Sequence, residues 1–180
     1  MLADNCKTTA YTYVGKELTW PIYGQATIGK AKEDLDRAAA SIVKTQANKN
    51  VQAYVSSLKA LVTQASSAIP VMPLYISLIY KVMKEEGTHQ GCIEQIYDLF
   101  TDKLTQSQPK VDELGRLYMN SKETNDVTQA KIKSLWDQVT QENFHELSDY
   151  VGYHHEFLKL FGFDLHGVDY DAEVETLIDW

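Results

Sequence analysis

The chain has 180 residues, of which 17 are Lys or Arg and 25 are Asp or Glu, so its formal net charge is −8. With 44% hydrophobic and 23% charged residues, the composition is that of a folded globular protein, and it excludes a disordered or collagen-like chain. The acidic balance argues against nucleic acid as a partner, because a phosphate backbone requires a basic protein face.

The sequence favours a cytoplasmic protein without an integral membrane segment. The first 20 residues carry charged side chains and no apolar core, unlike a secretory leader. Cys6 and Cys92 are expected to be reduced thiols. The longest apolar stretch, residues 69–83, is 15 residues long and contains two prolines, whereas a membrane-spanning helix needs ~20 apolar residues. We expect a buried helix in this stretch.

The first part of the chain predicts a strand, a helix and a second strand. Residues 8–14 (TTAYTYV) are β-branched and aromatic and predict a strand that ends at Gly15. Apolar residues recur every three or four positions between Ile28 and Ile42, which predicts a helix. Residues 51–58 (VQAYVSSL) predict the second strand. This order is that of a βαβ unit, so the predicted fold class is α/β.

The remainder is predicted to be mainly helical. Pro73 suits the first turn of a helix and Gly87 its end. Residues 93–104 and 127–139 show the apolar spacing of two further helices, and between them residues 115–120 (GRLYMN) predict a short exposed strand or a turn.

The C-terminal end is predicted to hold one more helix and a polar tail. Residues 157–161 (FLKLF) are expected in a last helix that ends near Gly162. Residues 167–180 are rich in Asp and Glu and are expected to be extended and solvated.

Tyr23 and Lys32 lie nine positions apart and are candidates for acid–base chemistry. A phenol has a pKa near ~10 and is a poor catalyst at neutral pH unless a cation stabilises its phenolate. On the expected helix, Lys32 lies at the inner edge of the apolar stripe, whereas Lys30 points away. The alternative is a structural lysine at the rim of the core that pairs with Asp36, one turn later.

Further candidates lie at the ends of the two expected strands. Tyr11 and Tyr13 share one face of the first strand. If that strand is parallel to its neighbour, its end lies where open α/β sheets bind ligands. Thr63 follows the second strand and would reach the same crevice.

Other motifs are weaker. Residues 24–31 (GQATIGKA) approach the phosphate-binding pattern of NTPases, but Ala31 has no hydroxyl to hold Mg²⁺ and Pro21 does not suit the strand that should precede the motif. His154 and His155 are adjacent and diverge by ~100° on a helix, so no metal site is expected.

Several longer runs resemble a known family. Residues 10–39 (AYTYVGKELTWPIYGQATIGKAKEDLDRAA), 53–100, 143–163 and 167–174 are similar to the trans-2-enoyl thioester reductases. These are the NADH-dependent enoyl-acyl-carrier-protein and enoyl-CoA reductases of bacterial fatty acid biosynthesis, in which eight residues separate the tyrosine and the lysine. The resemblance implies the C-terminal part of a Rossmann-like, short-chain-dehydrogenase-type fold followed by a mostly helical segment. Residues 1–110 would be the catalytic part, and residues 111–180 would match the family's so-called FAD-binding domain.

The resemblance also implies roles for individual residues. Tyr23 would be the proton donor, and Lys32 would assist it and contact the nicotinamide ribose of NADH. Tyr13 would touch the substrate, which is an enoyl-CoA or an enoyl-acyl-carrier-protein. The remaining cofactor-binding residues would be Leu61, Val62 and Thr63, in a short segment whose backbone lies against the nicotinamide end.

One part of the family pattern has no counterpart in the sequence. The nine glycines never form the G-x-G-x-x-G turn that holds the pyrophosphate of a dinucleotide. We therefore expect the chain to correspond to the C-terminal half of such a reductase, with a separate N-terminal half as a partner. The alternative function is that of a non-catalytic remnant or a subunit that needs this partner half.

Overall fold

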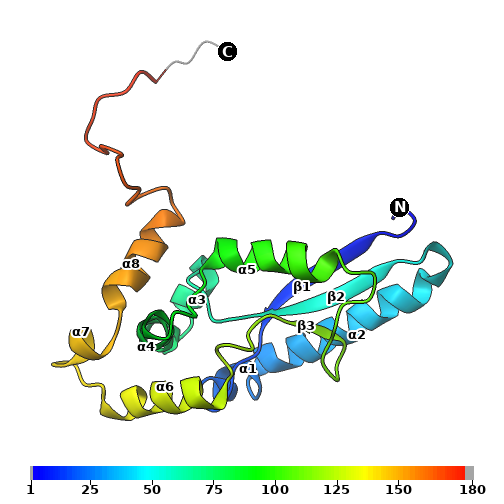
Figure 1. Cartoon of the computed structure of the whole chain (residues 1–180), viewed down its shortest axis with the longest axis horizontal. Coiled ribbons are helices and arrows are strands. Elements are labelled where there is room, and N and C mark those ends of the chain that lie inside the picture. Colours follow the sequence, from blue (N-terminus) through cyan, green and yellow to red (C-terminus); the bar gives the residue numbers. More distant parts are fainter. Residues whose placement is uncertain (1, 177–180) are drawn as a thin grey trace.

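A computed structural model describes residues 2–176 of the chain. Three strands form one parallel sheet in the order β1-β2-β3 (Figure 1). Their bounds are β1 Lys7–Tyr13, β2 Gln52–Leu58 and β3 Arg116–Tyr118. With the helices around the sheet, this confirms the α/β fold class.

The register brings the carboxyl ends of the three strands to one edge of the sheet. Tyr13 is the partner of Leu58, and Ser57 is the partner of Tyr118. The segments that follow all three strands therefore begin side by side, which is the place where open parallel sheets bind ligands.

Strand β3 corrects the expectation of a short exposed strand or turn at residues 115–120. Its central residue, Leu117, is fully buried, and the strand pairs with β2. The stretch is too short to show an alternating pattern, and only its pairing partner makes it an inner part of the fold.

Helices lie on both sides of the sheet (Figure 1). On one side runs α2 (Thr27–Thr45), the crossover between β1 and β2, as predicted. On the other side runs α5 (Cys92–Asp98), which continues as a π-helical stretch, η2 (Leu99–Leu104). The single helix predicted over residues 93–104 is therefore irregular in its second half.

The apolar core is centred on α4 (Met72–Glu85), which confirms a buried helix in that stretch. Pro73 lies in its first turn, and Gly87, at φ +65°, follows its end. Helices α6 (Asp126–Gln138) and α8 (Tyr150–Lys159) pack on α4. Within the described part of the chain, no helix is long and apolar enough to cross a membrane.

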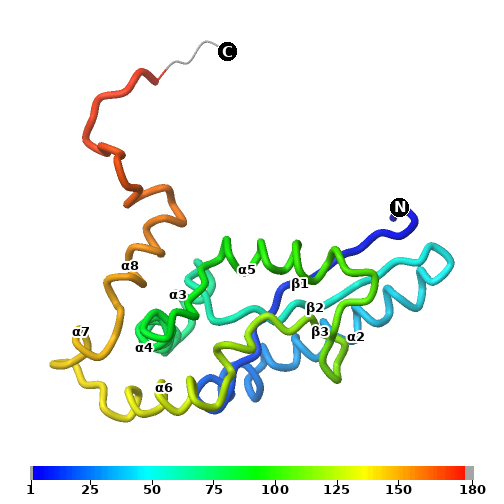
Figure 2. Tube along the Cα trace, viewed as in Figure 1, coloured from blue at the N-terminus to red at the C-terminus, as the bar shows by residue number. Residues whose placement is uncertain are grey.

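Shorter elements complete the chain. Four of them were not predicted: α1 (Trp20–Tyr23), η1 (Ala47–Lys49), α3 (Gln64–Ala68) and α7 (Phe144–Leu147). Helix α8 ends slightly earlier than expected, and after it the chain leads away from the body (Figure 2). Residues 167–176 are exposed and form no helix or strand, as predicted, and the last four residues of the predicted tail, 177–180, lie outside the described residues.

Candidate active site

The turn between α1 and α2 places Tyr23 beside the first turns of α2. Pro21 lies in the first turn of α1, where its missing N–H costs nothing. Gly29 is buried, and a Cβ atom at this position would lie 2.2 Å from the backbone oxygen of Gly24. Only glycine permits this approach of the two helices, which sets Tyr23 next to Lys32 one turn further on.

Lys32 and Tyr23 are in contact. The Nζ atom of Lys32 lies 5.2 Å from the centroid of the Tyr23 ring and donates a 2.8 Å hydrogen bond to Oγ1 of Thr12 on β1. The Lys32–Asp36 ion pair of the alternative does not form among the described residues. The Asp36 carboxylate instead accepts hydrogen bonds from both Nε and Nη2 of Arg116. This is the two-bond geometry in which a planar guanidinium pairs with a carboxylate.

The protonation states differ from the sequence-based expectation. Burial, and then the negative charge of Glu123, raise the pKa of Tyr23 above its ordinary value. Lys32 does not lower it overall, because its hydrogen bond goes to Thr12 instead of the phenol oxygen. Burial, and then Arg116, lower the pKa of Lys32. Tyr23 therefore stays a neutral phenol at neutral pH, which is the form that donates a proton. Its hydroxyl forms no hydrogen bond with any described residue.

Tyr13, the last residue of β1, packs against Tyr23. The two ring centroids are 4.8 Å apart at an interplanar angle of 83°, an edge-to-face contact. The Tyr13 hydroxyl donates a 2.8 Å hydrogen bond to Oε1 of Glu123 and lies 3.3 Å from Oγ1 of Thr19. The ring thus supports Tyr23, while the hydroxyl is directed at a buried carboxylate.

The segment after β2 is held by a dense set of hydrogen bonds. Thr63 caps α3, exchanging hydrogen bonds with Ser66 in a capping box. Ser66 also donates to the backbone oxygen of Leu61 at 2.8 Å, and the Cys92 thiol donates to that of Val62 at 3.6 Å. Within the described residues, the Leu61 N–H donates to no acceptor. The segment therefore has a fixed backbone with one free donor.

Most of the predicted site residues surround one cavity of about 370 Å³. Its wall includes Tyr13, Tyr23, Lys32, Leu61 and Thr63, which come from β1, α1, α2 and the segment after β2. Tyr11, on the same strand as Tyr13, also lines it although its side chain is 52% exposed.

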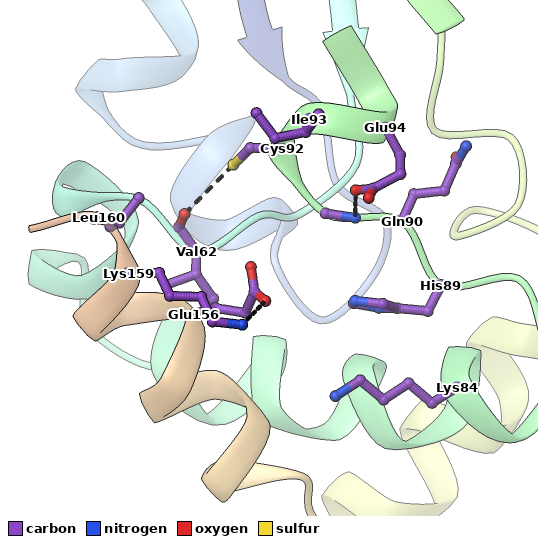
Figure 3. A pocket seen from close by; sticks show the side chains of 11 residues that line it. Val62, Lys84, His89, Gln90, Cys92, Ile93, Glu94, Glu156, Lys159 and Leu160 are labelled. Carbon is purple, nitrogen blue, oxygen red and sulfur yellow. Dashed lines mark hydrogen bonds and ion pairs between the residues drawn. The ribbon is translucent and has the colours of Figure 1, made fainter. Parts of the chain in front are cut away.

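Val62 is the exception and faces a neighbouring cavity of about 560 Å³ (Figure 3). Figure 3 shows Lys84, His89, Cys92 and Glu156 around this second space, with α8 forming one side. Both lysines and glutamates line this cavity, so the charge of its wall does not favour one class of ligand.

Three residues of the site were missed by the sequence analysis: Thr12, Lys59 and Glu123. Thr12 and Lys59 line the 370 Å³ cavity, and Glu123 is fully buried beside it. Each lies in or just after a parallel strand. Glu123 would have been found if residues 116–118 had been recognised as an inner strand, because a polar residue after such a strand falls at the ligand-binding edge.

The motifs that the sequence analysis rated weaker gain no support. Residues 24–31 join α1 to α2 and so follow a helix, whereas the phosphate-binding pattern follows a strand. His155 pairs with Asp164, while His154 lies near the Tyr150 ring. In residues 2–176 no cluster of three or more His, Cys, Asp or Glu side chains could hold a metal ion.

Comparison with known proteins places these features in a family. Residues 1–105 match the family model of the trans-2-enoyl-CoA reductase catalytic region. The chain belongs to the trans-2-enoyl-CoA reductase family. Residues 111–174 match a second family model, described as the enoyl reductase FAD-binding domain.

Curated relatives of this reductase family are close in sequence. The NADH-dependent enoyl-[acyl-carrier-protein] reductases of Pseudoalteromonas atlantica and Idiomarina loihiensis are 78% and 70% identical to the chain over 180 residues. In both cases the match covers 100% of this chain and 46% of the relative. The chain thus spans about half the length of the curated relatives it matches.

A solved structure of the family has the same fold. The trans-2-enoyl-CoA reductase of Clostridium acetobutylicum, solved in complex with NAD, superimposes with a TM-score of 0.91 at 43% identity. The similarity covers 96% of this chain and 45% of that chain. The partial Rossmann-like fold expected from the sequence is therefore confirmed.

The second family model names FAD, and residues 111–174 are the part of the chain that it matches. Helices α6 and α8 of this segment pack on α4, and its buried carboxylate, Glu123, is used by Tyr13 and Tyr75. The helix faces on α4 and the Glu123 carboxylate are therefore occupied by the fold and do not fit a flavin.

Proposed function

We propose that this chain carries the tyrosine–lysine site of an NADH-dependent reductase of trans-2-enoyl thioesters, acting in the cytoplasm in fatty acid biosynthesis. The substrate would be an enoyl-CoA or an enoyl-acyl-carrier-protein. The observation that carries the proposal is the convergence of Tyr23, Lys32 and Tyr13 on one cavity, with the Tyr23 hydroxyl free of hydrogen bonds.

The residues around the cavity fit the nicotinamide end of NADH. Lys32 and Leu61 both line the cavity, and an ammonium and a backbone N–H are donors suited to a ribose and a carboxamide. Val62 and Thr63 would complete this contact through their backbone. The chemistry that NADH supplies when bound is a hydride, for which the acceptor would be the β-carbon of the enoyl thioester.

Tyr23 would complete the reduction. As the carbon–carbon double bond takes up the hydride, an electron pair moves toward the thioester oxygen, and negative charge develops there as an enolate. The neutral phenol of Tyr23 would donate a hydrogen bond and then its proton to this enolate system. Lys32 would contact the nicotinamide ribose beside Tyr23, while Tyr13 would hold the Tyr23 ring and contact the substrate.

A second candidate function is that of a non-catalytic remnant or a subunit that requires a partner half. It is favoured by one observation: residues 1–180 contain no glycine-rich turn for a pyrophosphate. The two candidates differ in whether the chain alone binds NADH, which a titration of nicotinamide fluorescence measures.

The decisive experiment is Tyr23→Phe in an active background. A chimera in which residues 1–180 replace the matched segment of the Pseudoalteromonas atlantica reductase would be assayed for NADH oxidation with a short enoyl-CoA. We expect turnover to fall by about 100-fold or more, because the proton donor is lost, with little change in the KM for NADH. Tyr97→Phe, at a 66% exposed ring, is the matched control and should keep full activity. Unchanged turnover in Tyr23→Phe would contradict the proposal.

A further inference from the structure

Glu123 is a buried carboxylate that the proposed reaction does not use. It lies in the turn between β3 and α6 and its side chain is 0% exposed. The turn is anchored from both sides. The Asn120 amide donates to the backbone oxygen of Val14 at 3.0 Å, and the Gln129 amide donates to the backbone oxygen of Glu123 at 2.9 Å. The position of the carboxylate is thus set by the fold and does not depend on solvent.

The Glu123 carboxylate accepts hydrogen bonds from three different elements. Oε1 accepts from the hydroxyls of Tyr13 on β1 and Tyr75 on α4, each at 2.8 Å. Oε2 accepts from the N–H of Ala60, just after β2, at 2.7 Å. Glu123 itself follows β3, so one side chain connects the carboxyl ends of all three parallel strands to the central helix.

All three contacts are donated to the carboxylate, which fits the anion. Burial raises the pKa of Glu123, and the nearby ammonium of Lys59 opposes that rise. Burial, and then Glu123, also raise the pKa of both Tyr13 and Tyr75, so both remain phenols and donors. Removing a carboxylate from water costs free energy, and three donors compensate for it here. Losing one donor would leave part of that cost uncompensated and destabilise the fold.

These contacts lead directly to the candidate site. Tyr13 packs edge-to-face on Tyr23, and Ala60 begins the segment that would hold the nicotinamide end. We propose that Glu123 is a positioning residue of this site: it fixes Tyr13, and thereby Tyr23, relative to the segment after β2, and places a buried negative charge behind the Tyr13 ring. The inference rests on the proposed function for its effect on turnover, but its effect on Tyr23 is independent of that function.

The first test uses the chain itself and needs no activity. Tyrosine labelled with ¹³C at Cζ would be titrated by NMR, and Tyr23 would be assigned by the loss of its signal in Tyr23→Phe. In Glu123→Gln the charge is removed at nearly constant volume, so Tyr23 should titrate about one pH unit lower. The charged and titratable groups that face this pair are Lys32 and Tyr13 at Tyr23, and Lys59, Tyr13 and Tyr75 at Glu123.

Glu86→Gln is the matched control. Glu86 also accepts hydrogen bonds from a hydroxyl and an ammonium, those of Thr128 and Lys131, but it has no contact with the site. It should leave the Tyr23 titration unchanged. If Glu123→Gln folds and Tyr23 titrates as in the unsubstituted chain, or if Glu86→Gln produces the same shift, the inference is wrong.

The second test separates charge from hydrogen bonding in the active chimera. Glu123→Gln should lower kcat about tenfold and move the alkaline limb of the pH profile to lower pH. Tyr75→Phe keeps the charge and nearly the same volume, so it should lower kcat several-fold without moving that limb. It also serves if Glu123→Gln does not fold, because wild-type kcat in Tyr75→Phe would overturn the inference. If Tyr23→Phe were fully active, the proposed function would fail, and the NMR titration would still decide the action of Glu123 on Tyr23.

Discussion

At the scale of single residues, the site is defined by ionisable groups that are removed from water. Tyr23 is 6% exposed, Lys59 is 3% exposed and Glu123 is fully buried. Such groups change their pKa unless they are hydrogen-bonded or paired. Here the tyrosines are kept neutral and Glu123 is held by three donors. The Lys59 ammonium donates to the backbone oxygen of Ala60 and lies over the Tyr80 ring, and burial outweighs the attraction of the nearby Glu123 carboxylate.

Lys59 gives a pH-dependent prediction for stability. Burial lowers its pKa to about 8 in the folded chain, against ~10.4 in an unfolded chain. Between pH 8 and pH 10 the unfolded state therefore binds more protons at this residue. The contribution of Lys59 to the unfolding free energy should rise with pH in this window, by about 1 kcal/mol per pH unit.

The measurement is urea unfolding at pH 8.0 and 9.5 of the chain and of Lys59→Met. In Lys59→Met, the unfolding free energy should no longer show the increase between these two pH values that Lys59 contributes. Lys30→Met, at an exposed residue of α2 that pairs with Glu33, should keep it. An equal rise in the chain and in Lys59→Met would show that other groups cause it.

At the scale of elements, the site depends on how α2 is fixed to the sheet. The helix carries Lys32 on its inner side and Asp36 one turn later. Arg116 on β3 donates two hydrogen bonds to the Asp36 carboxylate. The side chains of this pair are only 12% and 16% exposed. The contact therefore sets the height of α2 along the sheet, and with it the position of Lys32 at the cavity.

Removing one partner of this pair should be costly. Asp36→Ala leaves a largely buried guanidinium without its carboxylate, and we expect it to lower the unfolding free energy by about 2–4 kcal/mol. Asp34→Ala, which breaks an exposed pair with Arg37 on the same helix, should have a much smaller effect because solvent screens that pair. Denaturant unfolding at neutral pH measures both.

A double substitution shows whether the loss of stability comes from an unpaired buried charge or from a change in the position of α2. Asp36→Leu with Arg116→Met removes both charges and should recover most of the lost stability. A small effect of Asp36→Ala, equal to that of Asp34→Ala, would mean that α2 is held mainly by its apolar contacts with β2.

At the scale of the whole molecule, the proposed function assigns these residues one side of a cofactor site. The cavity is lined by Tyr23, Lys32 and Leu61, which would face the nicotinamide end, and the sequence has no glycine-rich turn for the phosphates. The curated relatives have about twice the matched length. A dinucleotide would thus need backbone donors beyond those that these residues offer.

Complementation tests this directly. The chain and the remaining part of the Pseudoalteromonas atlantica reductase would be produced as two polypeptides and mixed or co-expressed. We expect NADH oxidation with a short enoyl-CoA only when both are present, because the pyrophosphate then gains its helix N-terminus. The chain with Tyr23→Phe is the inactive control. Micromolar binding of NADH by the chain alone would contradict this expectation.

The sequence by itself determined much of the local structure and the side of its helix on which Lys32 lies. Apolar periodicity predicted α2 and α4, β-branched runs predicted β1 and β2, and the inner position of Lys32 on its helix pointed to Tyr23. These features depend on residues that are near one another in the chain, so their pattern is visible without the fold.

Only the tertiary structure decided the features that depend on distant residues. The strand at residues 116–118 exists because β2 pairs with it. Asp36 pairs with Arg116 and not with Lys32 because β3 brings Arg116 to α2. Glu123 acquires its role for the same reason, since its partners Tyr13 and Ala60 lie 110 and 63 positions away. Burial creates the need for such partners, and burial is set by the packing of the whole chain and not by any local pattern.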